Sequence, residues 1–437
     1  MRIRGKRGRV ALLAALMAKK SSPGIIKRFF SSLGPGLITG AADDDPSGIA
    51  TYSAAGAQMG TSLLWTAFIT WPLMAAVQMM CARIGMVTGK GLAGALREKF
   101  PRPVLAVVSV ALLAANTINV GADLTGMADA VNMLTGINPH VCVILFGAGI
   151  GYATIHFRYH KIASVLKWLA LTLFSYVVTA FLVHPQWGKV AHDAFVPAWP
   201  RGHEAWAMLV AILGTTISPY LFFWQSSMEV EEEKAKGRRM LVFRQGASER
   251  DIIDRKMDVG TGVFFSNMVM FFIILTTTLT LHSHGMTKIE TSRQAAEALR
   301  PFAGTFAYVL FTLGIIGVGL LSIPTLTGSA AYAFAETFHW RQGLDEKFRR
   351  ARAFYAIIIL SVTVGILFDF LKVNPMRALF WTAVINGLLA PFLLIGILTV
   401  ACDSKIMRGQ SGSLLGKMVV AVTTVAMVVA AVGMFVF

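Results

Sequence analysis

The sequence predicts an all-α polytopic membrane protein, and three observations lead to this fold class. Apolar residues make up 55% of the 437 positions and charged residues only 14%, a composition outside the range of soluble globular domains. The apolar residues gather into eleven segments, most of them near or above the roughly 20 residues that a helix needs to cross a bilayer. Lysine and arginine concentrate in alternate connections between these segments, as membrane topology requires.

The expected crossings begin with a segment that follows a basic tail at 1–33, and residues 34–437 are expected to form a single transmembrane domain. They are placed at about 34–58, 62–88, 104–134, 139–156, 162–184, 204–228, 259–282, 304–333, 353–371, 376–400 and 414–437. The connections are short except for 186–203, 283–300 and a charged connector at 229–256. Because the number of crossings is odd, the two chain ends are expected on opposite sides of the membrane.

The net charge of +17 is explained by topology. Thirty lysines and arginines fall in the tail and in alternate connections, against seven in the remaining connections. This positive-inside pattern predicts a cell-membrane protein with a cytoplasmic N terminus and an outside C terminus. The sequence therefore indicates the lipid bilayer as its surroundings and predicts neither a nucleic-acid partner nor a protein partner. The cysteines Cys81, Cys142 and Cys402 lack paired spacing, so neither a disulfide framework nor a thiolate metal site is expected.

The first apolar segment contains the run Gly40-Ala-Ala-Asp-Asp-Asp-Pro-Ser-Gly48. A charged side chain near the bilayer centre costs roughly 3 kcal/mol even on lenient insertion scales, and proline removes a backbone donor. One interpretation is a loop between two short buried helices. The other is a broken transmembrane helix whose unwound middle offers carboxylate and carbonyl oxygens to a cation, and the continuous apolar flanks favour it.

A second interruption occurs in the sixth segment, where Pro219 follows the hydroxyl residues Thr215, Thr216 and Ser218. Hydroxyl side chains satisfy backbone groups that a proline frees inside a membrane. The first and sixth segments hold matching places in two five-crossing halves, about 34–184 and 204–400, which have opposite orientations because five is odd. Such a pair of interrupted segments indicates an inverted-repeat transporter with a central site, followed here by an eleventh helix at 414–437.

Several stretches resemble the NRAMP family of divalent-metal transporters. They are Gly34-Pro35-Gly36, the pair Asp45-Pro46 and Ala55–Gln58 in the first segment, Cys81–Gly89 in the second, Asp123-Leu124 in the third, and Ala390-Pro391-Phe392 followed by Asp403–Met407 at the tenth. The resemblance implies a LeuT-type fold, a five-plus-five inverted repeat with helices one and six broken and an eleventh helix added. It also implies a transporter that is not an enzyme, that needs no cofactor and whose cargo is a divalent metal ion.

The metal site that this resemblance implies is altered at several positions. The first helix keeps Asp45 and its proline, but Gly48 stands where the family has asparagine. In the sixth helix Thr215, Ser218 and Tyr220 stand where the family has alanine, methionine and histidine. The thioether is therefore missing, and with it the soft ligand that favours transition metals over magnesium and calcium.

The expected ligands are all oxygen atoms, from Asp45, Asp44, the Thr215 and Ser218 hydroxyls, and the backbone near Asp45 and Thr215. Two of the four substitutions shorten the side chain, which predicts a roomier cavity at the site. Magnesium keeps several waters and is held by one or two carboxylates, which suits such a site, and this chain is similar to the NRAMP-related magnesium transporters in lacking the methionine. The expected function is import of hard ions, Mg²⁺ and Mn²⁺, through an alternating-access central site.

Proton coupling in the family depends on acidic residues of helix three and histidines of helix six. Asp123 is retained, but the acidic positions beside it are Asn116 and Gly126, and the histidine positions are Tyr220 and Gln225. No imidazole is there to titrate near neutral pH. Because these residues are replaced, the resemblance implies weak or absent proton coupling. H⁺ is a co-substrate only if the chain is a conventional NRAMP symporter.

Three more residues are candidates for the ion pathway. Asp43 extends the acidic run, so that one of Asp43 and Asp44 lies in the site and the other at its entrance, or mutual repulsion leaves one of them protonated. Asn267 is either an interhelical hydrogen-bonding residue or a pathway residue. Asn386 lies five residues before Pro391, where the family often has a polar residue.

Three other functions remain open at this point. One is a conventional NRAMP symporter that couples Mn²⁺ or Fe²⁺ to protons. Another is a Na⁺-coupled transporter of an organic solute on the same fold, which three adjacent aspartates disfavour because a negative site repels carboxylate cargo. A third is an intramembrane aspartyl hydrolase using Asp45 and Asp123, which requires two carboxylates that share a site.

Overall fold

The computed structural model describes residues 35–157 and 171–437. The expected basic tail, 1–33, and the first part of the expected fifth crossing lie outside these ranges. Within them the chain is helical, with no strand. Nine helical stretches in the described ranges are long and apolar enough to cross a membrane, which makes the protein a multi-pass membrane protein.

The helices follow the expected segments closely. In the first half they are α3 (Pro35–Asp43), α4 (Pro46–Met59), α5 (Trp65–Thr88), α6 (Leu92–Leu96), α7 (Arg102–Thr135), α8 (Pro139–His156), α10 (Phe174–Leu182) and α11 (Trp187–Phe195). In the second half they are α12 (His203–Thr216), α13 (Pro219–Ala235), α14 (Glu249–Thr280), α15 (Ser292–Ala296), α16 (Arg300–Ala303), α17 (Ala307–Phe338), α18 (Arg352–Phe368), α19 (Pro375–Cys402) and α20 (Leu414–Val436).

Two expected crossings do not appear among the nine long stretches. The first is divided between α3 and α4, which have 9 and 14 residues, and the fifth is represented in the described ranges by α10. Helices extend into the expected charged connector at 229–256 from both sides, because α13 continues to Ala235 and α14 begins at Glu249. Ser248 and Asp251 form a capping box that starts α14, and charged residues at a helix end are stable where water or ion pairs satisfy them.

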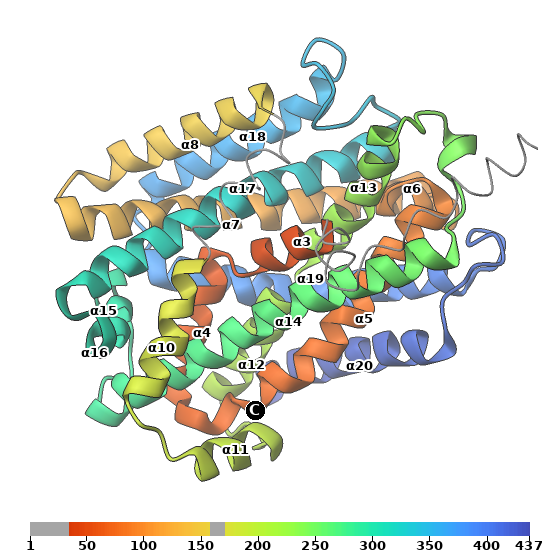
Figure 1. The fold of residues 1–437 in the computed structure, drawn as a ribbon. Coiled ribbons are helices and arrows are strands. Elements are labelled where there is room, and N and C mark those ends of the chain that lie inside the picture. Colours follow the sequence, from red (N-terminus) through yellow and green to blue (C-terminus); the bar gives the residue numbers. More distant parts are fainter. Residues whose placement is uncertain (1–34, 158–170) are drawn as a thin grey trace, which may run out of the picture.

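The helices pack in two groups. One contains α7, α8, α17 and α18, and the other contains the broken pairs α3–α4 and α12–α13 together with α5 and α14 (Figure 1). Helix α17 lies along α7 and also contacts α13 and α3, so the two groups meet beside the breaks. Helix α19 packs on α12, α4 and α7, and α20 covers α19 and α12.

The connections lie on the two sides of the bundle as the charge pattern predicts. On the lysine- and arginine-rich side, contacts join the ends of helices distant in sequence: Lys99 with Asp403, Ala247 with Gln410, and Arg97 with Glu336. On the opposite side they join Thr61 with Asp193, Asn374 with Glu290, and His203 with Met434. The chain therefore alternates between two faces, with Phe437 on the face poor in basic residues.

Candidate metal centre

The first break is a helix start built by the Asp-Pro pair. Asp45 is the N-cap of α4, with extended backbone angles (φ −69°, ψ 171°). Its Oδ1 accepts hydrogen bonds from the Gly48 N–H at 2.7 Å and the Ser47 hydroxyl at 2.6 Å. Aspartate is among the favoured N-cap residues, and proline fits the first helical position because the N–H there has no partner in any case. The predicted break is therefore a local property of these residues.

The second break separates α12 from α13 at Ile217 and Ser218. Ile217 leaves the helical region (φ −111°, ψ 59°), and Ser218 is the N-cap of α13 with Pro219 after it. The Ser218 hydroxyl donates to the carbonyls of Gly214 at 2.9 Å and Thr215 at 2.7 Å. The hydroxyl thus satisfies carbonyls that lost their helical partners, as predicted for this segment.

The two breaks face each other. A Cβ added to Gly48 would lie 3.2 Å from the Thr215 hydroxyl oxygen and 3.4 Å from the Tyr52 ring. The Tyr220 hydroxyl, on the first turn of α13, donates to the carbonyl of Ala42 at 3.0 Å, so it joins the start of α13 to the end of α3. The absence of a side chain at Gly48 therefore lets α4 and α12 approach closely.

Asp43 and Asp44 share one hydroxyl. Ser266 on α14 lies 2.8 Å from Oδ2 of Asp43 and 3.1 Å from Oδ1 of Asp44. All three aspartates of the run are buried, with at most 5% of each side chain exposed. The carboxylates are therefore held together at the break and shielded from solvent.

Asp45 is linked to Asp123 through an amide. The Asn119 side chain on α7 donates to Oδ2 of Asp45 and to Oδ2 of Asp123, both at 3.2 Å. Ser322 on α17 lies 3.2 Å from the same Asp123 oxygen, and the Asn386 amide on α19 lies 3.5 Å from Oδ1 of Asn119. The N-cap of α4 and three helices, α7, α17 and α19, thus contribute polar side chains to one buried network around the broken helices.

Several oxygens in this centre lack a hydrogen-bond donor. In the described part of the chain they are Asp43 Oδ1, Asp123 Oδ1, Thr215 Oγ1 and Asn386 Oδ1. An unsatisfied buried polar atom costs about 1–3 kcal/mol, so these acceptors favour a cation or water. The same part of the chain holds no group of three or more His, Cys, Asp or Glu side chains arranged to bind a metal. The atoms that the centre offers to a metal ion are accordingly carboxylate oxygens combined with neutral oxygens.

Three of the sequence candidates lie apart from this network. Asn116 donates to the Leu326 carbonyl and the Ser329 hydroxyl of α17. Asn267 accepts from Thr70 at 2.6 Å and joins α14 to α5. The Gln225 amide donates to Glu229 one turn further along α13.

Gln225 leads to a buried ion cluster that sequence reasoning missed. Arg255 on α14 contacts Glu229 at 2.7 Å, Asp258 at 2.5 Å and also Glu232. Asp258 in turn accepts the Gly36 N–H at 2.8 Å. The sequence interpretation placed Glu229, Glu232 and Arg255 in the charged connector at 229–256 and predicted no buried role for them. This cluster joins α13, α14 and the start of α3 on the basic side.

The contact between α3 and α14 depends on small residues. A Cβ added to Gly40 would lie 2.4 Å from the carbonyl carbon of Gly262, so the two backbones meet directly. Glycine permits such close approach between membrane helices.

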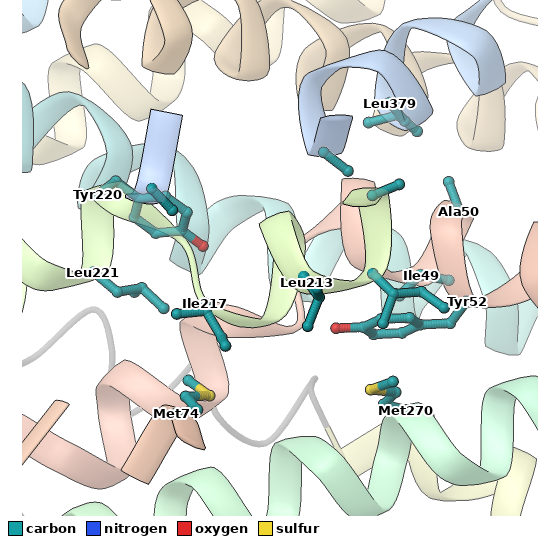
Figure 2. Close-up of a cluster of buried hydrophobic side chains, with 14 of the residues drawn as sticks. Ile49, Ala50, Tyr52, Met74, Leu213, Ile217, Tyr220, Leu221, Met270 and Leu379 are labelled. Carbon is teal, nitrogen blue, oxygen red and sulfur yellow. The ribbon is translucent and has the colours of Figure 1, made fainter. Parts of the chain in front are cut away.

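Two methionines near the second break belong to an apolar cluster. Met74 and Met270 belong to a buried cluster with Ile217 and Tyr52 (Figure 2). The Met270 sulfur is 3.9 Å from the Thr216 hydroxyl. In contrast, Ser218 at the break itself carries oxygen.

Comparison with known proteins identifies the family. A model of natural resistance-associated macrophage protein-like (Nramp) proteins matches residues 36–437. The chain belongs to the Nramp family. Its relatives include the divalent metal cation transporter MntH of Mesorhizobium japonicum, with 25% identity over 89% of this chain and 85% of that protein. MntH of Yersinia pestis is 28% identical over 68% of this chain and 71% of that protein.

A solved Nramp-fold structure has the same architecture. The manganese transporter of Eremococcus coleocola, crystallised with an aromatic bis-isothiourea compound, matches with a TM-score of 0.74 and 19% identity, covering 95% of this chain and 88% of that chain. The LeuT-type fold predicted for this Nramp chain is thereby confirmed. The chain is a transporter, and the intramembrane hydrolase alternative is wrong.

Three contributors to the centre were not proposed from sequence as site residues. They are Ser266, Ser322 and Asn119. Serine and asparagine occur in many membrane helices as packing residues, so their positions in the sequence carry little signal. Only the packing of α7, α14 and α17 around the breaks brings them to the aspartates.

Proposed function

We propose that this Nramp transporter carries divalent metal cations and prefers the hard ions Mg²⁺ and Mn²⁺. The observation that carries the proposal is the set of oxygen atoms at the two breaks, which belong to carboxylate, amide and hydroxyl groups. Four of these buried oxygens accept no hydrogen bond in the described part of the chain. Hard cations prefer oxygen ligands, whereas thioether and thiolate ligands select softer metals. Membership of the Nramp family and the names of the MntH relatives support a divalent cation as the cargo.

The ligands that we propose are Asp45, Asp44, Thr215, Ser218 and the backbone at Gly48, with Asp43 at the edge of the site. The Asp45 and Asp44 carboxylates supply charge, and Thr215 supplies a hydroxyl without a partner. Ser218 already donates to two carbonyls, so its oxygen is free to accept from a water or contact a cation. A hydrated Mg²⁺ is bound in this manner, through few carboxylates and retained waters.

Transport requires the centre to open alternately to the two sides. Asp43, Asp45 and Thr215 are each at most 1% exposed, so this arrangement is closed. On the basic side the closure includes the Arg255 cluster and the Tyr220–Ala42 hydrogen bond. We propose that this side is cytoplasmic, that the protein lies in the cell membrane with its C terminus outside, and that import ends with opening on the basic side.

We further propose that proton coupling is weak or absent. The hydrogen-bond partners of Asp45 and Asp123 are Asn119, Ser47, Ser322 and the Gly48 N–H. None of these partners titrates near neutral pH. The Gln225 and Tyr220 side chains, at the positions where the resemblance implies histidine, are both engaged in hydrogen bonds elsewhere.

Uptake into liposomes that contain the purified protein tests the cargo. We expect Mg²⁺ and Mn²⁺ to enter and to compete with one another, and Cd²⁺ to enter poorly. Efficient Cd²⁺ and Fe²⁺ uptake without Mg²⁺ uptake would contradict the hard-ion preference and support the conventional symporter. Uptake of an organic solute that requires Na⁺ and no metal would contradict the divalent-cation cargo itself.

A further inference from the structure

A basic pocket occupies the connection between α17 and α18. It has a volume of about 290 Å³ and is lined by Trp340, Arg341, Arg349, Arg350, Ala351, Arg352 and Ala353. We propose that this pocket binds the phosphate headgroup of an anionic phospholipid from the adjoining leaflet. The site is remote from the broken helices and is independent of the proposed cargo.

The charge of the pocket is largely uncompensated. All four arginines of the lining are exposed. Arg341 pairs with Glu346 at 3.4 Å, whereas Arg349, Arg350 and Arg352 have no carboxylate partner in the part of the chain that the structure describes. Guanidinium groups bind phosphate oxygens through paired, parallel hydrogen bonds. The pocket therefore offers three available guanidinium groups to one anionic group.

The start of α18 adds to this attraction. The helix begins at Arg352 and has 17 residues, and its N-cap Ala351 provides no side-chain hydrogen bond. The first N–H groups of a helix and its dipole favour phosphate at that end. Ala351 and Arg352 both line the pocket, so these N–H groups lie at the edge of the cavity.

The surroundings favour a lipid over free phosphate. α17 and α18 both belong to stretches that are long and apolar enough to cross the membrane, so the connection between them lies at the membrane surface. Phe338 stacks on Trp340, with ring centres 5.5 Å apart, and Phe338 remains 44% exposed. Exposed aromatic rings are typical of the headgroup region, and a free phosphate would make no use of them. Basic pockets between transmembrane helices bind the headgroups of anionic lipids in other membrane proteins.

Native mass spectrometry of the full-length protein in detergent, with added phosphatidylglycerol, tests this proposal. The test variant is Arg349→Gln with Arg350→Gln. The matched control is Arg239→Gln with Arg408→Gln, which removes the same charge from exposed arginines on the same side of the protein. Phosphatidylcholine and inorganic phosphate at equal concentration are the two comparison ligands.

We expect the wild type and the control variant to retain phosphatidylglycerol and to bind phosphatidylcholine weakly. The test variant should bind phosphatidylglycerol about 25-fold more weakly, since each arginine near a membrane surface contributes about fivefold. The midpoint of thermal unfolding of the test variant in detergent should equal that of the wild type, which shows that it is folded. Equal phosphatidylglycerol retention by the test and control variants would overturn the proposal, as would displacement of the lipid by inorganic phosphate.

Discussion

At the scale of single residues, Asp45 combines a structural and an electrostatic role. One carboxylate oxygen caps α4 through Gly48 and Ser47, and the other accepts the Asn119 amide. The cap needs only an oxygen acceptor, whereas a divalent cation also needs the negative charge. A substitution that keeps the acceptor and removes the charge therefore separates the two roles.

We expect Asp45→Asn to fold nearly as well as the wild type, because asparagine is as good an N-cap as aspartate. Divalent-metal uptake should fall more than about tenfold, corresponding to a loss of at least about 1.4 kcal/mol of interaction with the ion. Asp45→Ala should lose uptake and also about 0.5–2 kcal/mol of stability with the cap. Liposome uptake and thermal unfolding in detergent measure the two effects, and unimpaired uptake by Asp45→Asn would show that its charge is not used.

Ser218 is the residue at which ion preference should be adjustable. We expect Ser218→Met to raise Cd²⁺ uptake relative to Mg²⁺ several-fold, because a thioether favours softer ions. The variant should also lose about 1 kcal/mol of stability, since the Gly214 and Thr215 carbonyls lose their donor. The measurement is the ratio of Cd²⁺ to Mg²⁺ uptake in liposomes.

Met270→Leu is the control for this experiment. Its sulfur lies in the apolar cluster of Figure 2, and exchange of methionine for leucine conserves volume. The uptake ratio should stay at the wild-type value. A shift of the ratio in Met270→Leu and none in Ser218→Met would place the selective sulfur contact outside the break.

At the scale of elements, a hydrogen bond fixes α11 to the turn between α4 and α5. Thr61 donates to Asp193, and His192 lies beside the same carboxylate. The Thr61 hydrogen bond, with smaller help from His192, holds the pKa of Asp193 below its usual value. This contact lies outside the membrane-crossing helices, so buffer pH reaches it directly.

A carboxyl group with a depressed pKa stabilises the fold above its unfolded pKa of about 4, and this contribution disappears as the pH falls through the folded pKa. We expect Thr61→Val to lower the melting temperature by a constant amount between about pH 5 and 8. The difference from the wild type should shrink as the pH falls below about 4 and through the depressed pKa of folded Asp193. A difference that grew on acidification would contradict this origin.

At the scale of the whole molecule, hydropathy and charge predicted the crossings, the two breaks and the alternation of the connections. These features depend on local composition, and Asp45-Pro46 and Ser218-Pro219 each define a helix start by themselves. The partners of the aspartates were not predictable in this way. Ser266, Asn119 and Ser322 reach the centre only because three distant helices pack around it.

The Arg255 cluster was missed for a different reason. A hydropathy boundary separates charged from apolar residues, and it placed Glu229 and Arg255 in the charged connector and Asp258 just beyond it, at the edge of the seventh crossing. Charged residues can instead be buried within the fold when each of them has partners of opposite charge. Such pairing depends on tertiary contacts between α13 and α14 and leaves no mark in either segment alone.

The arrangement of the whole centre predicts metal uptake with little or no proton movement. In liposomes loaded with a pH-sensitive dye, we expect Mg²⁺ entry without matching acidification of the lumen, because no histidine is hydrogen-bonded to Asp45 or Asp123 in the described chain. The uptake rate should vary little between external pH 6 and 8. Acidification in step with metal entry would contradict weak coupling and favour the symporter alternative.

The short helix α3 has a mechanical consequence. With nine residues it is about 13 Å long, less than half the thickness of the hydrocarbon core. Along that length it rests on α14 through glycine, and the amide of Gly36 holds it to Asp258. We expect that α3, which packs against its neighbours through close backbone contacts and a few polar contacts, can move as a rigid helix while α4 stays in place. The centre would then open to one side of the membrane without repacking of the other helices.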